Sequence, residues 1–167
     1  FLAFTKNSRY KAKIIINCAG VNADTIQNML VKPSYVIHPR KGEYFVLSKD
    51  EGAKFTHTVF QPPTKAGKGI LITPTVHGNL LIGPDAESIP EKEDKSTSRD
   101  RLELIKATAA KSSQNINYLE QIRQFSGLRA ESDRDDFIIE ENKNIPDFID
   151  AAGIKSPGLS AAPAIAL

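Results

Sequence analysis

An arginine that follows a glycine at the end of an apolar run is the sharpest chemical feature of the sequence. Ser126-Gly127-Leu128-Arg129 closes the run that starts at Ile122. The guanidinium of Arg129 is permanently charged and can bind a carboxylate or a phosphate through two parallel hydrogen bonds. Gly127 has no side chain and would let the backbone approach the same ligand. The alternative is a surface ion pair between Arg129 and either Glu131 or Asp133.

A second group of cations precedes an expected strand. Arg40 and Lys41 stand directly before Gly42 in the segment Pro39-Arg40-Lys41-Gly42-Glu43-Tyr44. Two positive charges beside a glycine can hold an anionic group. The alternative is a solvated entry to the strand, in which both side chains extend into water.

Small residues follow the β-branched run near the N-terminus, in Asn17-Cys18-Ala19-Gly20-Val21-Asn22. Small residues at the carboxyl end of a strand allow a ligand to approach the backbone, and this is where α/β proteins bind ligands. Tight packing of the strand on the next helix is an equally good explanation. We interpret Cys18 as a small buried apolar residue rather than a nucleophile.

A glycine-containing loop precedes the alanine-rich segment at the end of the chain. The loop runs from Gly153 to Ser160, with Pro157 near the first turn of the expected helix. The N–H groups at a helix N-terminus attract negative charge, so the loop can receive an anionic or electron-rich edge of a ligand. An ordinary capped loop is the alternative.

The three histidines lie about twenty residues apart, at His38, His57 and His77. None has a partner at the spacing typical of metal ligands. We therefore expect no metal site and assign each histidine a surface or hydrogen-bonded position.

The expected secondary structure that positions these residues changes along the chain, from an α/β segment to antiparallel strands. Lys13–Asn17 is an unalternated β-branched run, which predicts a parallel strand covered on both faces. Ile26, Met29 and Leu30 recur at helical spacing after it, with Asn22 or Asp24 near the N-cap. Four short antiparallel strands are expected next, at 42–47, 56–60, 69–73 and 79–82, with a turn at 76–79. A helix follows that begins at a Thr97 or Ser98 cap and buries Leu102, Ile105 and Ala109. The last expected elements are strands at 122–128, 137–140 and 148–151 and a final helix.

This order predicts an α+β fold, in which a mixed, mostly antiparallel sheet is flanked by pieces of an α/β domain. The expected boundaries are 1–34 for the first α/β piece, 35–125 for the antiparallel sheet domain and 126–167 for the return to the α/β domain. The chain lacks an initiator Met and is apolar at both ends. We therefore expect it to be a fragment of a longer protein.

Composition narrows the class of protein. The 167 residues carry 22 Lys and Arg against 20 Asp and Glu, so the net charge is +2. That balance, without an aromatic and basic stripe, disfavours binding to nucleic acid. One cysteine excludes a disulfide framework. No apolar run approaches the length of about 18 residues needed for a membrane span, and we expect a cytoplasmic protein, free or at a membrane surface.

Five of these segments, taken in order, resemble FAD-dependent oxidoreductases of the D-amino acid oxidase type. Residues 15–24 are similar to the family's "VINAAGxxAD" and residues 40–44 to its "RGEY", although Lys41 stands between the arginine and the glycine here. Residues 72–84 match "TPTxxGNLLIGP", residues 126–129 match "SGLR" and residues 152–163 match "GIxSPGLSSAPA". The resemblance covers nearly the whole chain and is closest to glycerol-3-phosphate dehydrogenases and L-2-hydroxyglutarate oxidases.

The resemblance implies an FAD-binding domain, a substrate domain and transfer of a hydride from glycerol 3-phosphate or a small 2-hydroxy acid to the flavin, which a quinone or oxygen reoxidises. It implies that Arg129 binds the substrate's anionic group, with Arg40 or Lys41 nearby, and that His57 or His77 is the base. The residues it places at the cofactor are Ala19, Gly20, Gly127, Lys155, Ser156, Pro157, Gly158, Leu159 and Ser160.

One family feature is missing from the sequence. No G-x-G-x-x-G follows a strand, and Gly67-Lys68-Gly69 lacks both the third glycine and the helix. We therefore expect the full-length parent, with its N-terminal FAD-binding portion, to be the enzyme, and this fragment neither to bind FAD tightly nor to turn over. The alternatives are an amino acid oxidase of the same superfamily and a non-catalytic α+β binding module.

Overall fold

The buried apolar residues gather in two separate clusters, and each cluster is the core of its own unit. The computed structural model describes residues 1–62 and 69–167. Unit 1 consists of residues 1–40, 89–92 and 129–167, and unit 2 consists of residues 41–88 and 93–128. Two long strands, β4 (Ile37–Leu47) and β8 (Gln121–Ser132), begin in one unit, end in the other and pair with each other.

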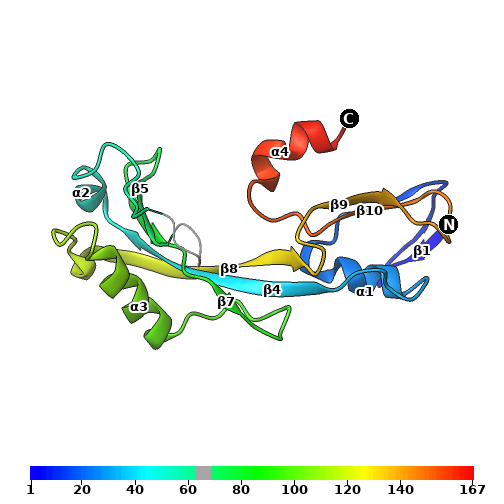
Figure 1. Cartoon of the computed structure of the whole chain (residues 1–167), viewed down its shortest axis with the longest axis horizontal. Coiled ribbons are helices and arrows are strands. Elements are labelled where there is room, and N and C mark those ends of the chain that lie inside the picture. The colour runs from blue at the N-terminus through cyan, green and yellow to red at the C-terminus, as the bar shows by residue number, and fades with distance from the viewer. Residues whose placement is uncertain (63–68) are drawn as a thin grey trace. The chain divides into compact units, whose positions relative to one another are not determined.

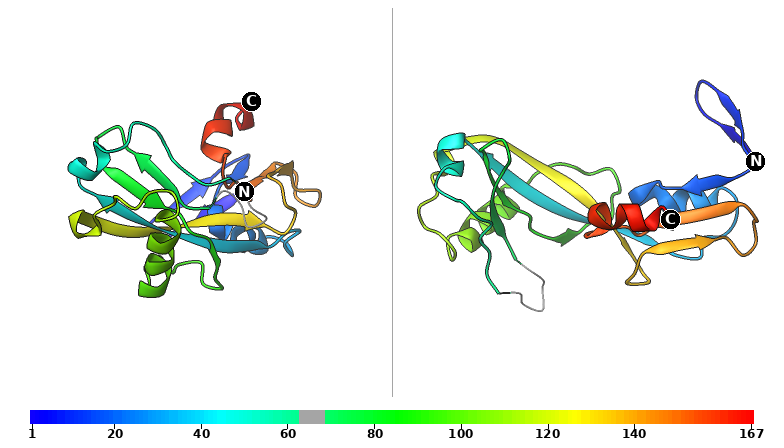
Figure 2. Two further views of the ribbon diagram at one scale, coloured as in Figure 1. Left: turned by 60° about the vertical axis from the view of Figure 1, so that its left-hand side comes forward. Right: turned by 90° about the horizontal axis from the view of Figure 1, so that it is seen from above.

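Unit 1 contains a mixed three-stranded sheet. Its order is β3-β10-β9, with β3 parallel to β10 and β9 antiparallel to β10; Figures 1 and 2 show the β9–β10 pair. The elements are β1 (Leu2–Phe4) and β2 (Arg9–Lys11), which form a hairpin, β3 (Ile15–Asn17), the 3₁₀ turn η1 (Gly20–Asn22), α1 (Ala23–Asn28), β9 (Ile138–Glu141), β10 (Phe148–Ala152) and α4 (Gly158–Ile165).

The parallel strand predicted near the N-terminus is confirmed, but its burial differs from the prediction. Ile16, on β3, is 60% exposed, so the face of the sheet to which it points is not covered as the prediction required. The predicted helix stripe is also wrong, since Met29 is 71% exposed and α1 buries Ala23 and Gln27 instead. Cys18 is exposed, so the interpretation as a buried apolar residue is wrong too. Periodicity gave the types of these elements but not what covers them.

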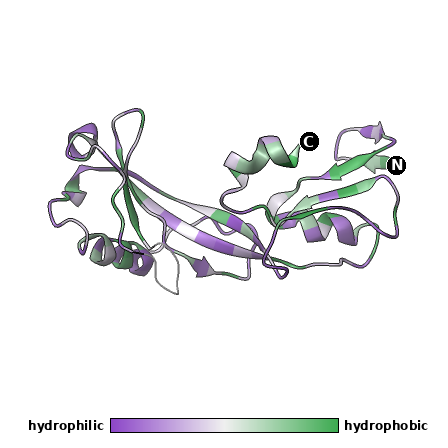
Figure 3. Cartoon of the chain, turned by 45° about the horizontal axis from the view of Figure 1, so that its top comes forward, coloured by the Kyte–Doolittle hydropathy of each residue, from purple (hydrophilic) through white to green (hydrophobic). Residues whose placement is uncertain are grey.

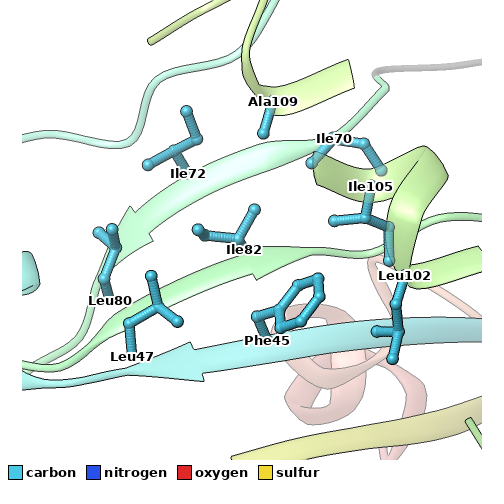
Figure 4. Packing of buried hydrophobic residues seen from close by; sticks show 9 residues of the cluster. All are labelled: Phe45, Leu47, Ile70, Ile72, Leu80, Ile82, Leu102, Ile105 and Ala109. Atoms are coloured by element: carbon cyan, nitrogen blue, oxygen red, sulfur yellow. The ribbon is translucent and has the colours of Figure 1, made fainter. Parts of the chain in front are cut away.

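Unit 2 is built on the antiparallel sheet that the sequence predicts. The strands lie in the order β5-β6-β4-β7, with β8 also paired to β4. The elements besides β4 and β8 are α2 (Lys49–Gly52), β5 (Leu71–Pro74), β6 (Leu80–Gly83), β7 (Glu87–Ser88), α3 (Arg99–Ala109) and η2 (Tyr118–Glu120). In its core α3 packs over the sheet, as Figure 4 shows with Phe45, Leu47, Ile70, Ile72, Leu80, Ile82, Leu102, Ile105 and Ala109.

Local sequence signals account for the details of unit 2. The side chain of Ser98 accepts a hydrogen bond from the Arg101 amide at the start of α3, so it is the predicted N-cap. The predicted turn at 76–79 joins β5 to β6, and Gly78 takes a φ of +88° there. The predicted strand at 56–60 is reduced to a single bridge, between Val59 and Ile72. Gly67 and Lys68 lie outside the described residues.

The predicted α+β class, with a mixed and mostly antiparallel arrangement of strands, is confirmed. In the described ranges 1–62 and 69–167, no helix is both long and apolar enough to cross a membrane. The short helix α4 is coloured white to green in Figure 3, in line with its alanine, leucine and isoleucine content.

Candidate functional site

In unit 1 two cations from distant parts of the chain share one carboxylate. Arg40 Nη1 lies 3.4 Å from Glu131 Oε2, and Lys155 Nζ forms a short ion pair with Glu131 Oε1. Arg40 lies on β4, Glu131 on β8 and Lys155 in the loop before α4. The hydrogen bond from Lys155 holds the pKa of Glu131 below its ordinary value, although partial burial acts in the opposite direction. The carboxylate therefore stays charged at neutral pH and ties the loop to the sheet.

Arg129 belongs to the same cluster. It stands two residues before Glu131 on β8, and residues at that spacing share one face of a strand. Its Nη1 donates a hydrogen bond of 3.5 Å to the carbonyl oxygen of Arg40. Two cations thus contact the Glu131 carboxylate, and the third, Arg129, contacts the backbone of one of them. A group of guanidinium and ammonium side chains suits a small anion.

Lys41, the alternative to Arg40, has different partners. Its side chain is 6% exposed and its ammonium lies 2.9 Å from Asp94 and 3.9 Å from Glu43, all within unit 2. The hydrogen bond to Asp94 raises the pKa of Lys41 despite its burial. Consecutive residues of a strand face opposite sides, which explains why Arg40 and Lys41 do not share partners.

The carboxylate of Glu43 is itself part of a buried polar network in unit 2. Both of its oxygens accept hydrogen bonds from the Ser98 amide, at 3.1 and 3.0 Å. Burial raises the pKa of Glu43. Nearby, Asp85 accepts from the Glu43 amide at 2.7 Å and from Arg101 Nε at 2.5 Å. Lys41 and Glu43 are therefore engaged with each other and with residues that hold the start of α3.

The turn after β3 is fixed from behind by Asn17. Its Oδ1 accepts from the Ala19 amide at 3.3 Å, and its Nδ2 donates to the Ala23 carbonyl at 2.9 Å. Gly20 is exposed and has a φ of +58°, and a Cβ built there would meet no atom within 4 Å. The turn thus combines a fixed backbone with open space in front of Gly20.

A fully buried carboxylate supports this turn. Asp150, on β10, accepts hydrogen bonds from Asn17 Nδ2 at 2.8 Å, from Tyr35 Oη at 2.8 Å and from Gln27 Nε2 at 2.6 Å. Burial, followed by the hydrogen bond to Asp150, raises the pKa of Tyr35. Three donors, from β3, α1 and the segment before β4, therefore surround one carboxyl group.

The loop before α4 is held against β8 at a second point. Gly153 has a φ of +64°, and a Cβ there would lie 2.9 Å from the Ser132 Cβ. Gly158 is buried, while Ser156, Pro157, Leu159 and Ser160 are exposed. The Gly158 amide donates a hydrogen bond of 2.7 Å to the Lys155 carbonyl. Because the first N–H groups of an α-helix have no acceptor within the helix, the following amides, of Leu159 and Ser160, are suited to a ligand.

The remaining candidates lie in unit 2. His57 is exposed, and its Nδ1 lies 2.9 Å from Thr56 Oγ1. His77 is exposed in the turn between β5 and β6. Gly127, on β8, is exposed with no atom within 4 Å of a built Cβ. In the part of the chain that the structure describes, no group of three His, Cys, Asp or Glu side chains could hold a metal ion.

The structure thus brings Arg40, Arg129 and Lys155 together and places them in the same unit as Gly20 and Gly158. Sequence reasoning treated Glu131 only as a possible ion-pair partner and missed Asp150. Each had a signal: Glu131 follows Arg129 at the spacing of one strand face, and Asp150 interrupts an apolar strand, as Asn17 does.

Comparison with known proteins identifies the family of the chain. The sequence model of the family described as FAD dependent oxidoreductase matches residues 3–167. The chain belongs to this family. The predicted resemblance to FAD-dependent oxidoreductases of the D-amino acid oxidase type is therefore confirmed.

Among its relatives, the glycerol 3-phosphate dehydrogenase of Caloramator mitchellensis is 48% identical over 163 residues, which cover 98% of this chain and 34% of the relative. The L-2-hydroxyglutarate dehydrogenase of Escherichia coli (strain K12) is 31% identical over 84 residues, 48% of this chain and 20% of the relative. The chain thus spans about a third of the length of the first of these relatives.

A solved structure of a similar protein has the same fold as this chain. The L-alpha-glycerophosphate oxidase of Mycoplasma pneumoniae, determined in its dithionite-reduced form with FAD bound, superposes with a TM-score of 0.83 at 32% identity. The match covers 92% of this chain and 40% of the oxidase chain. The dehydrogenase of Caloramator mitchellensis and this oxidase are thus similar to the chain over nearly all of its length.

Proposed function

We propose that this chain is part of a longer flavoenzyme that oxidises glycerol 3-phosphate or a small 2-hydroxy acid. The observation that carries the proposal is the group of three cations in unit 1: Arg40 and Lys155 contact Glu131, and Arg129 contacts the backbone of Arg40. A permanent cation that can make two parallel hydrogen bonds suits the phosphate or carboxylate that both substrate classes carry. In the proposal, Arg129 binds this group and Arg40 lies beside it.

The residues present fit an FAD cofactor. Gly20 leaves space where another residue would place a Cβ, so a ring or ribityl chain can approach the backbone. The amides of Leu159 and Ser160 in the first turn of α4 and the ammonium of Lys155 suit an edge that gains negative charge. We assign Ala19, Gly20 and the loop from Lys155 to Ser160 to the cofactor, together with Gly127.

FAD, when bound, supplies the acceptor for the hydride that leaves the carbinol carbon. The chain's own contribution is to bind the anionic group through Arg129 and to orient the hydroxyl for loss of its proton. His57 and His77 stay predictions for the base that accepts this proton. A quinone or oxygen is the proposed final acceptor.

We further propose that unit 1 belongs to the FAD-binding domain and unit 2 to the substrate domain. The sequence-based boundaries at residues 34 and 125 fall close to the end of the first segment of unit 1, at residue 40, and to the end of the last segment of unit 2, at residue 128. Since no G-x-G-x-x-G follows a strand in this sequence, the pyrophosphate of FAD is bound by another part of the longer protein. The chain alone is proposed to bind FAD weakly and to have no turnover.

Two purified proteins test the proposal. The longer protein that contains this chain is expected to copurify with FAD and to turn over glycerol 3-phosphate or L-2-hydroxyglutarate in preference to amino acids. The 167-residue chain alone, titrated with FAD, is expected to show no micromolar binding. Turnover of amino acids alone would favour the amino acid oxidase alternative, and absence of FAD from the longer protein would refute the assignment.

A further inference from the structure

Glu131 has no role in the proposed chemistry, yet it contacts two of the cations that do. Each oxygen of its carboxylate has a different partner, Arg40 on one side and Lys155 on the other. We propose that Glu131 is a positioning residue that holds Lys155 at the cofactor and Arg40 at the substrate, an inference that rests on the proposed function.

Glu131 lies on a long strand, whereas Lys155 lies in a loop. Glu131 lies on the long strand β8, next to the buried Ser132. Lys155 lies in the loop before α4, and its side chain is 30% exposed. A lysine has four rotatable side-chain bonds and is strongly hydrated, so without a fixed partner it extends into water. The ion pair with Glu131 therefore selects one position of the ammonium.

The neighbouring cations make this role stronger. Arg40 lies 3.4 Å from the Glu131 carboxylate that Lys155 also contacts, and like charges in a partly buried cluster repel one another. With a neutral residue in place of Glu131, Lys155 would gain repulsion from Arg40 and lose its anchor at the same time. The substitution should thus displace Lys155 rather than simply remove one negative charge.

These two effects change the flavin's reduction potential in opposite directions. Removal of a negative charge near the ring stabilises the reduced, anionic flavin and raises the potential. Displacement of the Lys155 ammonium removes a stabilising positive charge and lowers the potential. The sign of the change in Glu131→Gln therefore distinguishes positioning from a purely electrostatic effect.

The experiment uses the longer protein loaded with FAD and measures the midpoint potential of four variants. Glu131→Gln and Lys155→Met are each expected to reduce the preference for the two-electron-reduced flavin about tenfold, which equals about 30 mV. In the double variant the ammonium is already absent, so the change at Glu131 only removes a negative charge, and the potential is expected to equal or exceed that of Lys155→Met. Glu91→Gln, an exposed glutamate of the same unit, is the matched control and should leave the potential unchanged.

A rise in potential in Glu131→Gln, or an additive decrease in the double variant, would overturn the inference. Amide hydrogen exchange across residues 154–160 gives a second readout that needs no FAD. Exchange there should be faster in Glu131→Gln and intermediate in Glu131→Asp, and equal exchange in all variants would also overturn the inference. A longer protein without FAD would instead refute the proposed function, and the exchange measurement would still decide the role of Glu131.

Discussion

Asn17 and Asp150 lie directly opposite each other on the parallel strands β3 and β10, and Asn17 Nδ2 donates a hydrogen bond of 2.8 Å to Asp150 Oδ1. The two residues are 133 positions apart in the sequence. Their contact joins the two ends of the chain and fixes the turn that presents Gly20. The stability of unit 1 and the shape of the proposed cofactor turn therefore depend on the same buried polar pair.

Asp150→Asn should destabilise unit 1 substantially. Both oxygens of Asp150 accept from buried donors, so the new amide nitrogen would face a donor, whichever way it is turned. We expect a loss of about 2–4 kcal/mol in the free energy of unfolding, measured by urea denaturation. Asp147→Asn, at an exposed position three residues earlier, is the control and should change the stability by less than about 0.5 kcal/mol. A loss of that small size in Asp150→Asn would show that the network contributes little.

Asp24 should make the stability of unit 1 decrease at acidic pH. Burial raises the pKa of Asp24, but hydrogen bonds from Lys92 and from the amides of Ile37 and Thr25 outweigh it, and the pKa lies below the ordinary 3.8. Since the folded pKa is lower than the unfolded one, the contribution is complete above about pH 5 and is lost as the pH falls through the lowered pKa. Asp24→Asn should therefore cost about 1–2 kcal/mol at pH 7 and progressively less below pH 4.

Denaturation of both proteins at several pH values between 7 and 2.5 tests this expectation. Asp135→Asn, at an exposed position in the same unit, provides the control, and its stability should follow that of the unaltered chain throughout. A constant difference between Asp24→Asn and the unaltered chain over the whole range would contradict the assigned ion pair.

Two glycines should respond differently to the same substitution. A Cβ at Gly52 would lie 1.8 Å from the carbonyl oxygen of Gly78, so Gly52→Ala forces the backbone of α2 away from the turn between β5 and β6. We expect a loss of about 2 kcal/mol or more in the stability of unit 2. Gly127→Ala meets no atom within 4 Å, and its stability should stay within about 0.5 kcal/mol of the unaltered chain.

Gly127→Ala also tests the assignment of this residue to the cofactor. In the longer protein, a methyl group in this space should reduce FAD occupancy after dialysis while leaving the thermal unfolding of the apoprotein unchanged. Full FAD occupancy would indicate that the space at Gly127 serves no cofactor.

Arg129→Met should impair substrate binding more than folding. Loss of a charged donor to the substrate's anionic group should raise KM on the order of 100-fold, while the stability changes little because Arg129 is only half-buried. Arg129→Lys keeps the charge but not the geometry for two parallel hydrogen bonds. Its KM should therefore lie between that of the unaltered protein and that of Arg129→Met. Steady-state kinetics with glycerol 3-phosphate measure both variants, and an unchanged KM would remove Arg129 from the proposed site.

The sequence predicted elements better than partnerships. The run Ile14-Ile15-Ile16 was sufficient to predict a strand, and Ser98 was sufficient to predict the start of α3, because both signals are local. The β10 partner of β3 lies far along the chain, so periodicity carries no information about it. The stripe of Ile26, Met29 and Leu30 has helical spacing, but Gln27 is buried instead, since Asp150 binds it.

In the candidate site, too, local features could be predicted from the sequence and long-range partners could not. Alternation along a strand predicts that Arg40 and Lys41 face opposite sides, yet it does not tell which side faces Arg129. Glu131 and Asp94 decide that, and they come from 91 and 53 residues away, respectively. The loop before α4 was recognisable from its glycines and from the family's motif, whereas its ion pair with β8 was not.

Anaerobic addition of substrate to the FAD-loaded longer protein tests the central claim most directly. The proposal predicts that glycerol 3-phosphate or L-2-hydroxyglutarate bleaches the yellow oxidised flavin, and that Arg129→Met needs far more substrate for the same bleaching. A protein that stays yellow with both compounds, or that Arg129→Met leaves equally sensitive to substrate, would contradict it.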